Sequence, residues 1–497
     1  MGTRTNLNEE QYVQFAFLSE GQKRLIYSEA LEILQYTGVK IYHPAARELL
    51  AEHNCTVQGH RVFIPSQLVR RTLTWVPPVT TIHHWDGSGK LRVELDRTYF
   101  GPGPTCPNFI DPWSGERRKY FREDAAAVAR VCDALSGIDF VMSLGMISDV
   151  TEGLEEVYEF AEMIQNSPKP IIAWCHSKEN CRYIHEIAAV MAGSKEQLQH
   201  RPNYIFYNEP ISPLSCDYSA LDKLMYCAQQ GIPQIFAPAN TAGATVPATH
   251  AAHLVVTLAE SLTGTVISQL VQPGACIIIG GTQSILDMRN ATFAYGAPEL
   301  SILSAGLAEM AEYIGLPVFT AAGCSDSKVE DIQAALEATL SIHSAMLSGA
   351  TLVHDVGFLE SGMTGSLFQL VLSDEIISRA RHIVKGVFVT GESMAEDVIH
   401  AVGPGGDFRD QEHTRKWQSL RWSSQLGHAS IFEDQTEKTP DMRTRVHHKL
   451  LNILETHKGP SDAIARDSRD AIQRILERAE EDQANGRRGP ENSVQGL

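Results

Sequence analysis

Short apolar runs alternate along most of the chain with longer stretches in which apolar residues recur at helical spacing. Each run has the length of one buried strand, and nearly every run ends in polar, glycine or aromatic residues. Successive runs are about 30–45 residues apart, which fits one strand followed by one helix. The eight runs begin at Thr98, Ile138, Pro170, Asn203, Ile232, Ala275, Leu316 and Ala350.

Eight strand–helix units in series predict an α/β fold, a closed (β/α)8 barrel of the TIM type. The catalytic residues of such barrels lie at the C-terminal ends of the strands, so the last residues of each run are the candidates for function. Helical periodicity predicts the helices at 124–135, 154–165, 179–192, 218–230, 250–270, 299–314, 329–348 and 367–389.

The segments outside the barrel are predicted to be mainly helical. A capping box at Ser19–Gln22 begins a helix that runs to about Tyr36, and a short strand is expected at Arg61–Ile64. We divide the chain into four parts: an N-terminal helical arm or cap at 1–95, a barrel catalytic domain at 96–390, a mainly helical C-terminal extension at 391–482, and a disordered tail at 483–497. The extension is expected to contain helices at 443–456 and 460–482.

Charge and composition narrow the class of protein. The formal net charge of −18 argues against a nucleic-acid partner, because phosphate recognition needs a basic face. The nine cysteines are scattered without a CxxC pair, which indicates reduced thiols in a cytoplasmic protein. The most apolar span, 254–281, is interrupted by Glu260, Gln269, Gln272 and Pro273, so we expect no membrane helix.

Glu209 closes the fourth run and is followed by a proline. A glutamate at this place resembles the acid/base residue of retaining glycoside hydrolases, which need a second carboxylate about 5 Å away. The seventh run supplies no glutamate, and Glu360 after the eighth run is a possible substitute. A hydrolase that uses Glu209 and Glu360 is therefore an alternative, beside a substrate-binding role for Glu209.

A zinc site is a second alternative. His176 and His354 end the third and eighth runs, and Cys175 and Cys324 lie near strand ends. Histidine and cysteine side chains from different strands can bind zinc, but no local ligand spacing is present, so no tightly bound metal is expected. A binding or scaffold barrel without catalysis remains a further alternative.

Aromatic residues on the runs suggest a site for a cation. Rings at the barrel mouth would offer a quadrupole surface to a quaternary ammonium, worth ~0.5–2 kcal/mol each. Strand alternation sends only about half of them inward. The candidates are Tyr99, Phe100, Phe206, Tyr207, Phe236, Phe319 and Phe358, and we expect Asn240, Gln283, Asp326 and His354 to hold a polar group of the same ligand.

Several long segments resemble the trimethylamine methyltransferase family, in particular its members without pyrrolysine. The resemblance extends over the whole chain from Leu18 to the C-terminal helices. It rests on LSEGQKRLIYSEALEILQYTGVKI, GPGPT followed by SGERRKY, AESLTGTVISQLVQPGACIIIGG, GAPELSILSAGLAEMAEYIGLPV, GCSDSKVEDIQA and LVLSDEI.

The resemblance implies a barrel that presents a methylated amine to cob(I)alamin on a partner corrinoid-binding protein. Family members that act on trimethylamine carry pyrrolysine, and a relative that acts on glycine betaine lacks it. This chain contains only standard residues. The resemblance therefore implies a quaternary amine such as glycine betaine, whose neutral leaving group needs no general acid.

A betaine carboxylate would need donors opposite the aromatic cage. Strand-end position makes His354 the first candidate, followed by Asn240, Gln283 and His176, while Asp326 and Glu209 could balance the ammonium charge. The aromatic cage is expected from Tyr99, Phe206, Phe236 and Phe358. We also expect a homo-oligomer, because the segments outside the barrel add packing surface.

Overall fold

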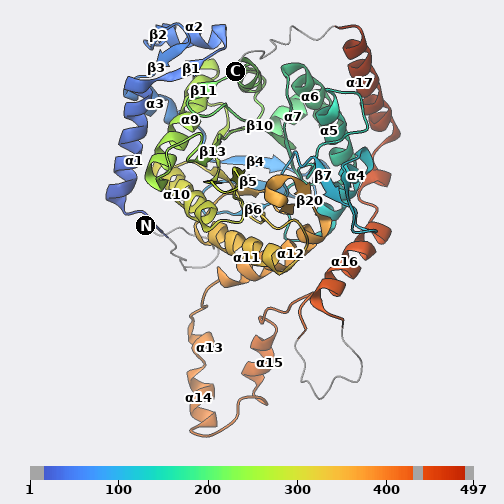
Figure 1. Cartoon of the computed structure of the whole chain (residues 1–497). Helices are drawn as coiled ribbons and strands as arrows, with labels where there is room; N and C mark the ends of the chain where they lie inside the picture. The colour runs from blue at the N-terminus through green and yellow to red at the C-terminus, as the bar shows by residue number, and fades with distance from the viewer. Residues whose placement is uncertain (1–15, 429–439, 487–497) are drawn as a thin grey trace.

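The computed structural model describes residues 16–428 and 440–486, and its centre is a parallel barrel (Figure 1). The extreme N-terminus and residues 487–497 of the predicted tail lie outside the described residues. Seven barrel strands pair in the order β6-β18-β17-β14-β12-β10-β9. Their bounds are β6 (Tyr99–Phe100), β9 (Ile171–Ala173), β10 (Tyr204–Asn208), β12 (Gln234–Phe236), β14 (Ile277–Gly280), β17 (Val318–Ala321) and β18 (Leu352–His354).

The second apolar run closes the barrel between β6 and β9, although it is too short to form a named strand. Its Asp139 N–H donates to the Phe100 carbonyl at 2.7 Å. On its other side, Val141 forms a parallel bridge with Ile171. All eight runs thus contribute to the barrel wall, as the sequence predicted.

Eight helices form a ring around the barrel, and each packs on the next until α12 meets α4. The α8 helix begins and ends where the sequence predicted, whereas α12 ends at Ile383, six residues before the predicted end. The ring consists of α4 (Arg122–Ala134), α5 (Glu155–Asn166), α6 (Lys178–Ala192), α8 (Tyr218–Gln230), α9 (His250–Val271), α10 (Pro298–Ile314), α11 (Ile332–Leu347) and α12 (Leu367–Ile383).

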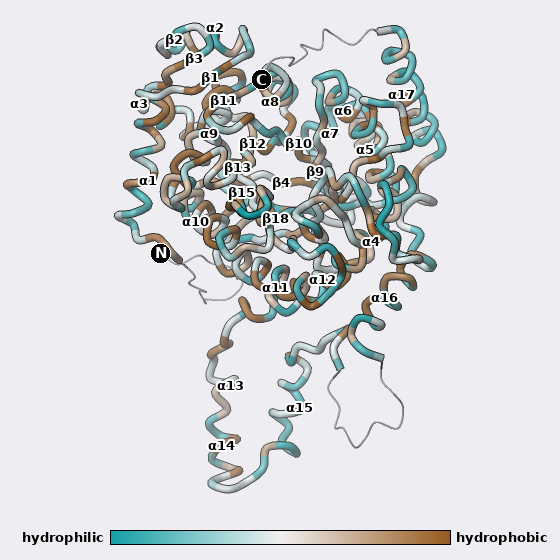
Figure 2. Tube along the Cα trace, viewed as in Figure 1, coloured by the Kyte–Doolittle hydropathy of each residue, from teal (hydrophilic) through white to brown (hydrophobic). Residues whose placement is uncertain are grey.

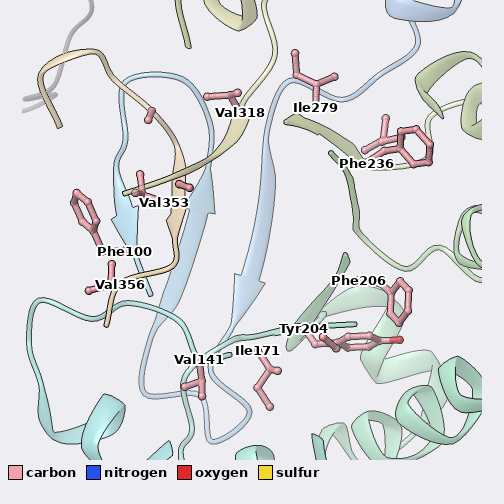
Figure 3. Packing of buried hydrophobic residues seen from close by; sticks show 14 of the residues in the cluster. Phe100, Val141, Ile171, Tyr204, Phe206, Phe236, Ile279, Val318, Val353 and Val356 are labelled. Atoms are coloured by element: carbon pink, nitrogen blue, oxygen red, sulfur yellow. The ribbon is translucent and has the colours of Figure 1, made fainter. Parts of the chain in front are cut away.

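Side chains that alternate along the strands form two separate apolar layers. The outer layer lies between the strands and the helix ring and includes Phe100, Phe206 and Phe236 (Figure 3). The inner layer fills the barrel with Ile205, Tyr207, Ile235, Ile278, Phe319 and other residues. Because both layers are apolar, each strand is buried on both faces, as parallel sheets usually are.

A hairpin of β4 (Thr80–His83) and β5 (Lys90–Val93) closes the N-terminal end of the barrel (Figure 1). Ile82, Leu91 and Val93 of this hairpin belong to the inner layer, and the His83 N–H donates to the Pro202 carbonyl just before β10. The C-terminal end of the barrel is therefore the end at which polar side chains can meet a ligand.

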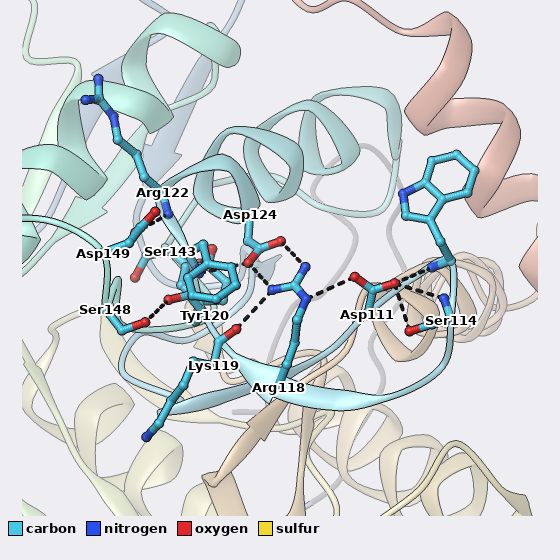
Figure 4. A network of polar contacts seen from close by, with 12 residues as sticks. Asp111, Ser114, Arg118, Lys119, Tyr120, Arg122, Asp124, Ser143, Ser148 and Asp149 are labelled. Carbon is cyan, nitrogen blue, oxygen red and sulfur yellow. Dashed lines mark hydrogen bonds and ion pairs between the residues drawn. The ribbon is translucent and has the colours of Figure 1, made fainter.

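The loop after β6 carries a second hairpin, of β7 (Asn108–Ile110) and β8 (Arg117–Lys119), at the C-terminal end of the barrel. Arg118 holds it against α4, with both guanidinium nitrogens on Asp124 (2.6 and 2.8 Å) and Nε on Asp111 (3.0 Å) (Figure 4). Bidentate pairs of this kind fix geometry. They explain why the SGERRKY segment carries Arg118.

The N-terminal segment and the last two helices pack on the outside of the helix ring, whereas α13 (Gly391–Met394), α14 (Glu396–Val402) and α15 (Glu412–Gln418) project away from it (Figure 1). The N-terminal part contains α1 (Glu20–Glu32), with the predicted capping box at Ser19 and Gln22, but it also contains strands, among them β1 (Val39–Ile41), β2 (Thr56–Gln58) and β3 (Arg61–Phe63). It is thus not purely helical. At the other end, α16 (Met442–Thr456) packs on α12 and α4, and α17 (Arg466–Ala484) on α5 and α6.

Among the described helices, α9 is the one that is long and apolar enough to cross a membrane. However, 94% of its apolar window is buried inside the protein. This helix therefore belongs to the core of the protein.

Candidate active site at the C-terminal ends of the strands

Tyr207 and Glu209 reach the inside of the barrel at the end of β10. Tyr207 belongs to the inner apolar layer, and Glu209 follows two residues later on the same side. The Tyr207 hydroxyl donates to Glu209 Oε2 at 2.8 Å. Part of Glu209 is exposed to solvent, but the protein around its carboxyl group displaces water from it and so raises its pKa.

His354 and Asp355 lie opposite, at the end of β18. The His354 ring stacks on Phe319, with ring centres 4.0 Å apart and planes at 4°. Its Nδ1 lies 2.6 Å from Asp355 Oδ1, and its Nε2 lies 3.2 Å from Thr282 Oγ1. Both ring nitrogens therefore have a partner, and Asp355 fixes the orientation of the imidazole.

Tyr295 comes from outside the barrel strands and completes the group. It follows the hairpin of β15 (Thr282–Asp287) and β16 (Thr292–Phe293), and its hydroxyl donates to Asp355 Oδ2 at 2.9 Å. Burial and the neighbouring Asp355 charge raise the pKa of Tyr295, so its hydroxyl keeps its proton. Both Asp355 oxygens are thus held from opposite sides.

Gly103 of the GPGPT segment touches the same carboxylate. A Cβ atom at this position would lie 2.0 Å from Asp355 Oδ1 and 2.6 Å from the Phe358 ring. Any side chain would therefore displace Asp355, which explains why this segment has a glycine here.

These side chains form one connected group, which we call the inner site. The Tyr207 ring lies 5.3 Å from Phe319 and 6.3 Å from His354, measured between ring centres. The group combines aromatic faces with two carboxylates. The inner site consists of Tyr207, Glu209, Thr282, Tyr295, Phe319, His354 and Asp355.

Comparison with known proteins places this barrel in a family. The family model described as trimethylamine methyltransferase (MTTB) matches residues 3–483. A trimethylamine methyltransferase MttB of Desulfitobacterium hafniense strain DCB-2 is 31% identical over 89% of this chain and 90% of its own. A glycine betaine methyltransferase of Desulfitobacterium hafniense strain Y51 is 29% identical over 90% of this chain and 94% of its own.

The chain belongs to the trimethylamine methyltransferase family. It is therefore a methyltransferase, which favours transfer chemistry over the hydrolase alternative. A solved structure supports the fold: the monomethylamine methyltransferase MtmB of Methanosarcina barkeri has a TM-score of 0.51 and 11% identity, over 89% of this chain and 88% of that one. The predicted TIM-type barrel is confirmed.

In this methyltransferase, Asn240 and Gln283 do not belong to the inner site. Asn240 lies on β13 (Ala239–Ala242) and donates to Thr257 and Glu260 of α9, both at 2.9 Å. Gln283 pairs with Asn240 across the strands, so it shares this outward face. Because Thr282 points inward to His354, its neighbour Gln283 must point outward. We call Asn240, Thr257, Glu260 and Gln283 the outer polar layer.

Three of the four predicted cage rings lie away from the inner site. Phe206 and Phe236 are fully buried in the outer apolar layer (Figure 3), and the ring of Phe236 fills the space beside Gly264 of α9. The Tyr99 hydroxyl bonds to the Arg92 backbone on β5, at the closed end of the barrel. Only Phe358 adjoins the inner site, with its ring 6.4 Å from that of Tyr295.

His176 lies on the rim of the barrel, just after β9. The neighbouring strand β10 carries Tyr207 of the inner site. Its side chain is 70% exposed, its ring meets the Trp174 ring at 5.0 Å, and its Nδ1 pairs with Glu156. The hydrogen bond that His176 donates to the Glu156 carboxylate raises the pKa of His176. His176 thus offers positive charge at the rim as pH falls toward its raised pKa.

Asp326 and Glu360 have structural partners. Asp326 Oδ1 accepts from the Tyr295 N–H and from the Ser361 hydroxyl, both at 2.8 Å, so it positions the Tyr295 segment. Glu360 pairs with Arg117 at 2.9 Å and accepts from Thr364 at 2.6 Å. The second carboxylate of the inner site is Asp355 rather than either of these.

Cys175 and Cys324 remain thiols. Cys175 Sγ donates to the Ser177 carbonyl at 3.0 Å, Cys324 Sγ to the Tyr295 carbonyl at 3.8 Å, and burial raises the pKa of both well above the usual value. Across residues 16–428 and 440–486, no three His, Cys, Asp or Glu side chains are grouped as metal ligands. The geometry offers no support for the zinc alternative.

Some residues of the inner site that the sequence analysis did not select had a signal in the sequence, and others had none. Asp355 follows His354 directly, and Tyr207 and Phe319 were among the strand aromatics. Tyr295 had no comparable signal, because it lies outside every strand run and reaches Asp355 only through the β15–β16 hairpin.

Proposed function

We propose that this protein transfers a methyl group from a quaternary amine to cob(I)alamin carried by a separate corrinoid-binding protein. The observation that carries the proposal is the inner site, where Glu209 and Asp355 lie among the rings of Tyr207, Phe319, His354 and Tyr295. Catalysis is assigned to the barrel, residues 96–390, and the setting that we propose is the cytoplasm.

The inner site suits a cation that has no hydrogen to donate. Each aromatic face contributes ~0.5–2 kcal/mol to binding of a quaternary ammonium. A carboxylate about 4 Å from the cation contributes up to about 4 kcal/mol at an effective dielectric constant of 20. Because Tyr207 and Tyr295 already donate to Glu209 and Asp355, the carboxylates stay oriented without help from the ligand.

The chemistry of a quaternary amine matches the residues that are present. Its leaving group is a neutral tertiary amine, so no side chain has to protonate it. Cob(I)alamin supplies the strong nucleophile. The chain's own part is to orient one N-methyl group toward the open C-terminal end and to keep water away from it. The lack of pyrrolysine in the sequence supports a quaternary rather than a tertiary amine.

A betaine is the substrate that we propose, with its carboxylate directed to His176. The sequence pointed first to His354, but its ring is buried and both ring nitrogens have partners, whereas the His176 side chain is 70% exposed at the rim. His176 carries the raised pKa at the rim, and the buried Lys223 lies near both His176 and Glu209. The charged ends of a betaine would then face groups of opposite sign.

The test is a methyl-transfer assay with reduced cobalamin and glycine betaine, carnitine, choline and trimethylamine. We expect methylcobalamin from a betaine, and a loss for His176→Ala that is at least tenfold greater with the betaine than with choline. Equal loss with both substrates would remove His176 from carboxylate binding. Methyl transfer from trimethylamine alone would contradict the quaternary-amine proposal. The enzyme, with its net charge of −18, is expected to need no nucleic acid.

A further inference from the structure

Trp174 lies at the C-terminal end of the barrel, in the first position after β9. Along β9, Ile172 belongs to the inner apolar layer and Ala173 to the outer one, so alternation turns Trp174 inward. Its ring packs on the inner layer and remains partly exposed. Trp174 is not among the residues of the inner site, although tryptophan offers the strongest aromatic surface to a cation.

Two neighbours place Trp174 beside the inner site. Phe206 of β10 pairs with Ala173 of β9. The next row of the two strands therefore sets Tyr207 beside Trp174. On the other side, the His176 ring meets the Trp174 ring edge-on, with ring centres 5.0 Å apart and planes at 71°. The indole thus lies between Tyr207 of the inner site and His176 at the rim.

A buried glutamate, Glu159, lies on the barrel side of α5. The outer side of this helix contacts α17, which is largely hydrophilic (Figure 2), and there the Tyr158 hydroxyl donates to Glu480 at 2.6 Å. Glu159 is the next residue, is only 1% exposed and accepts the Ile147 N–H at 3.1 Å. Successive residues of a helix point about 100° apart, so Glu159 faces the barrel wall rather than α17.

The Glu159 carboxyl group adjoins Trp174. The Trp174 indole N–H and the Ser143 hydroxyl both lie beside it. Trp174 Nε1, Ser143 Oγ and Glu159 Oε2 are buried, and within residues 16–428 and 440–486 none of the three has another hydrogen-bond partner. Burial and the nearby Glu156 charge raise the pKa of Glu159 well above its usual range, so its carboxyl group keeps a proton and can both donate and accept. Glu159 is thus the group that can fix the indole.

We propose that Trp174 forms a wall of the amine site that selects for the positive charge of the substrate, and that Glu159 positions its indole. The inference rests on the proposed quaternary-amine function, because ring faces bind an ammonium that has no hydrogen to donate. Tyr207 would cover one side of the cation, and Trp174 the side toward His176. Glu159 does not touch the substrate, so it is a positioning residue.

The binding test compares glycine betaine with 3,3-dimethylbutanoate, in which a carbon atom replaces the charged nitrogen. The two compounds share shape and carboxylate, so they differ only in the cation. In calorimetric titrations, Trp174→Leu should weaken glycine betaine binding about tenfold and change 3,3-dimethylbutanoate binding by less than about threefold. Trp174→Phe keeps a ring and should lose only about threefold with glycine betaine.

Trp85→Leu is the matched control. Trp85 is also partly buried, and its indole N–H donates to the Ser167 carbonyl at 2.9 Å, at the closed N-terminal end of the barrel. The substitution should leave both dissociation constants unchanged. Intrinsic fluorescence gives a second readout, because glycine betaine should change the emission of the wild type and of Trp85→Phe but not of Trp174→Phe.

A double-mutant cycle tests Glu159. Glu159→Leu removes the acceptor at similar volume and should weaken glycine betaine binding about three- to tenfold, whereas Glu159→Gln should keep the wild-type affinity. In the Trp174→Leu background, Glu159→Leu should add no further loss. Additive losses in variants with unchanged circular dichroism would overturn the positioning role of Glu159.

Two outcomes would overturn the role of Trp174: equal weakening of both compounds by Trp174→Leu, or no weakening of either. A wild type that binds glycine betaine no more tightly than 3,3-dimethylbutanoate would instead contradict the quaternary-amine function itself.

Discussion

The inner site and the outer polar layer lie on opposite faces of the same strand ends. Thr282 and Gln283 are adjacent in the sequence, yet Thr282 contacts His354 inside the barrel, whereas Gln283 is buried on the outer face of the strand beside Asn240. Each group contains one glutamate whose pKa is raised because the protein displaces water from its carboxyl group. This glutamate is Glu209 in the inner site and Glu260 in the outer polar layer. The comparison shows that strand-end position selects candidates, whereas the face on which a side chain lies decides whether it lines the proposed site or packs against the helix ring.

The largest expected effect comes from Asp355→Asn. The substitution keeps the shape but removes the charge that orients His354 and that, in the proposed complex, would face the ammonium. We expect kcat/KM for methyl transfer to fall by about 100- to 1,000-fold, as the loss of about 3–4 kcal/mol implies. Stopped-flow formation of methylcobalamin measures it. A loss below threefold would mean that the inner site does not bind the cation.

Glu209→Gln should reduce kcat/KM by about 10- to 100-fold, chiefly through KM. Because burial raises the pKa of Glu209, the wild-type carboxyl keeps its proton to higher pH than usual, and cation binding should strengthen as pH rises through that pKa. The variant should lack this rise. The pH profile of KM for both proteins is the measurement.

The same shift has a consequence for stability with the opposite sign. A carboxyl group whose folded pKa is raised stabilises the fold fully below its unfolded pKa and loses this contribution as pH rises through the folded pKa. Glu209→Gln should therefore unfold at an equal or higher temperature than the wild type at pH 8. A lower melting temperature would indicate that Glu209 is structural.

Tyr207→Phe is expected to have a smaller effect, about three- to tenfold in kcat/KM. The variant keeps the ring beside Phe319 but removes the hydrogen bond to Glu209. Without that bond the pKa of Glu209 should rise further, so the onset of activity should move to higher pH. An unchanged pH profile would separate Tyr207 from the titration of Glu209.

The smallest catalytic effect is expected outside the barrel, from Glu260→Ala. Glu260 accepts hydrogen bonds from Asn240, Ser212 and the Leu214 N–H. Their loss should destabilise the fold by about 2–4 kcal/mol and leave kcat/KM within about twofold below the melting temperature. Thermal unfolding and the transfer assay together test this contrast with Asp355→Asn.

The sequence was sufficient for the barrel because each strand is an apolar run and each helix has its own periodicity. It was sufficient for the α8 bounds because Asp217 caps the start of the helix and Gly231 its end. It also placed His354 and Glu209 at strand ends. These features are local, so they can be read from neighbouring residues.

The facing of side chains could not be predicted in the same way. In a barrel strand both faces are apolar, so Phe206 and Tyr207 differ in no property that tells inside from outside. The strands β13 and β15 extend past the barrel wall. On them, Asn240 and Gln283 lie on the outer face rather than at the inner site. Tyr295 depends on the path of a hairpin, which no local pattern of residues encodes.

The β4–β5 hairpin that closes the N-terminal end has a kinetic consequence for the proposed reaction. Ile82, Leu91 and Val93 fill that end, so the amine and the methyl acceptor must use the same opening. A corrinoid protein docked there would trap the demethylated amine until it dissociates. Binding must then be ordered, amine before acceptor and acceptor release before product release, and an excess of the unmethylated acceptor should inhibit turnover.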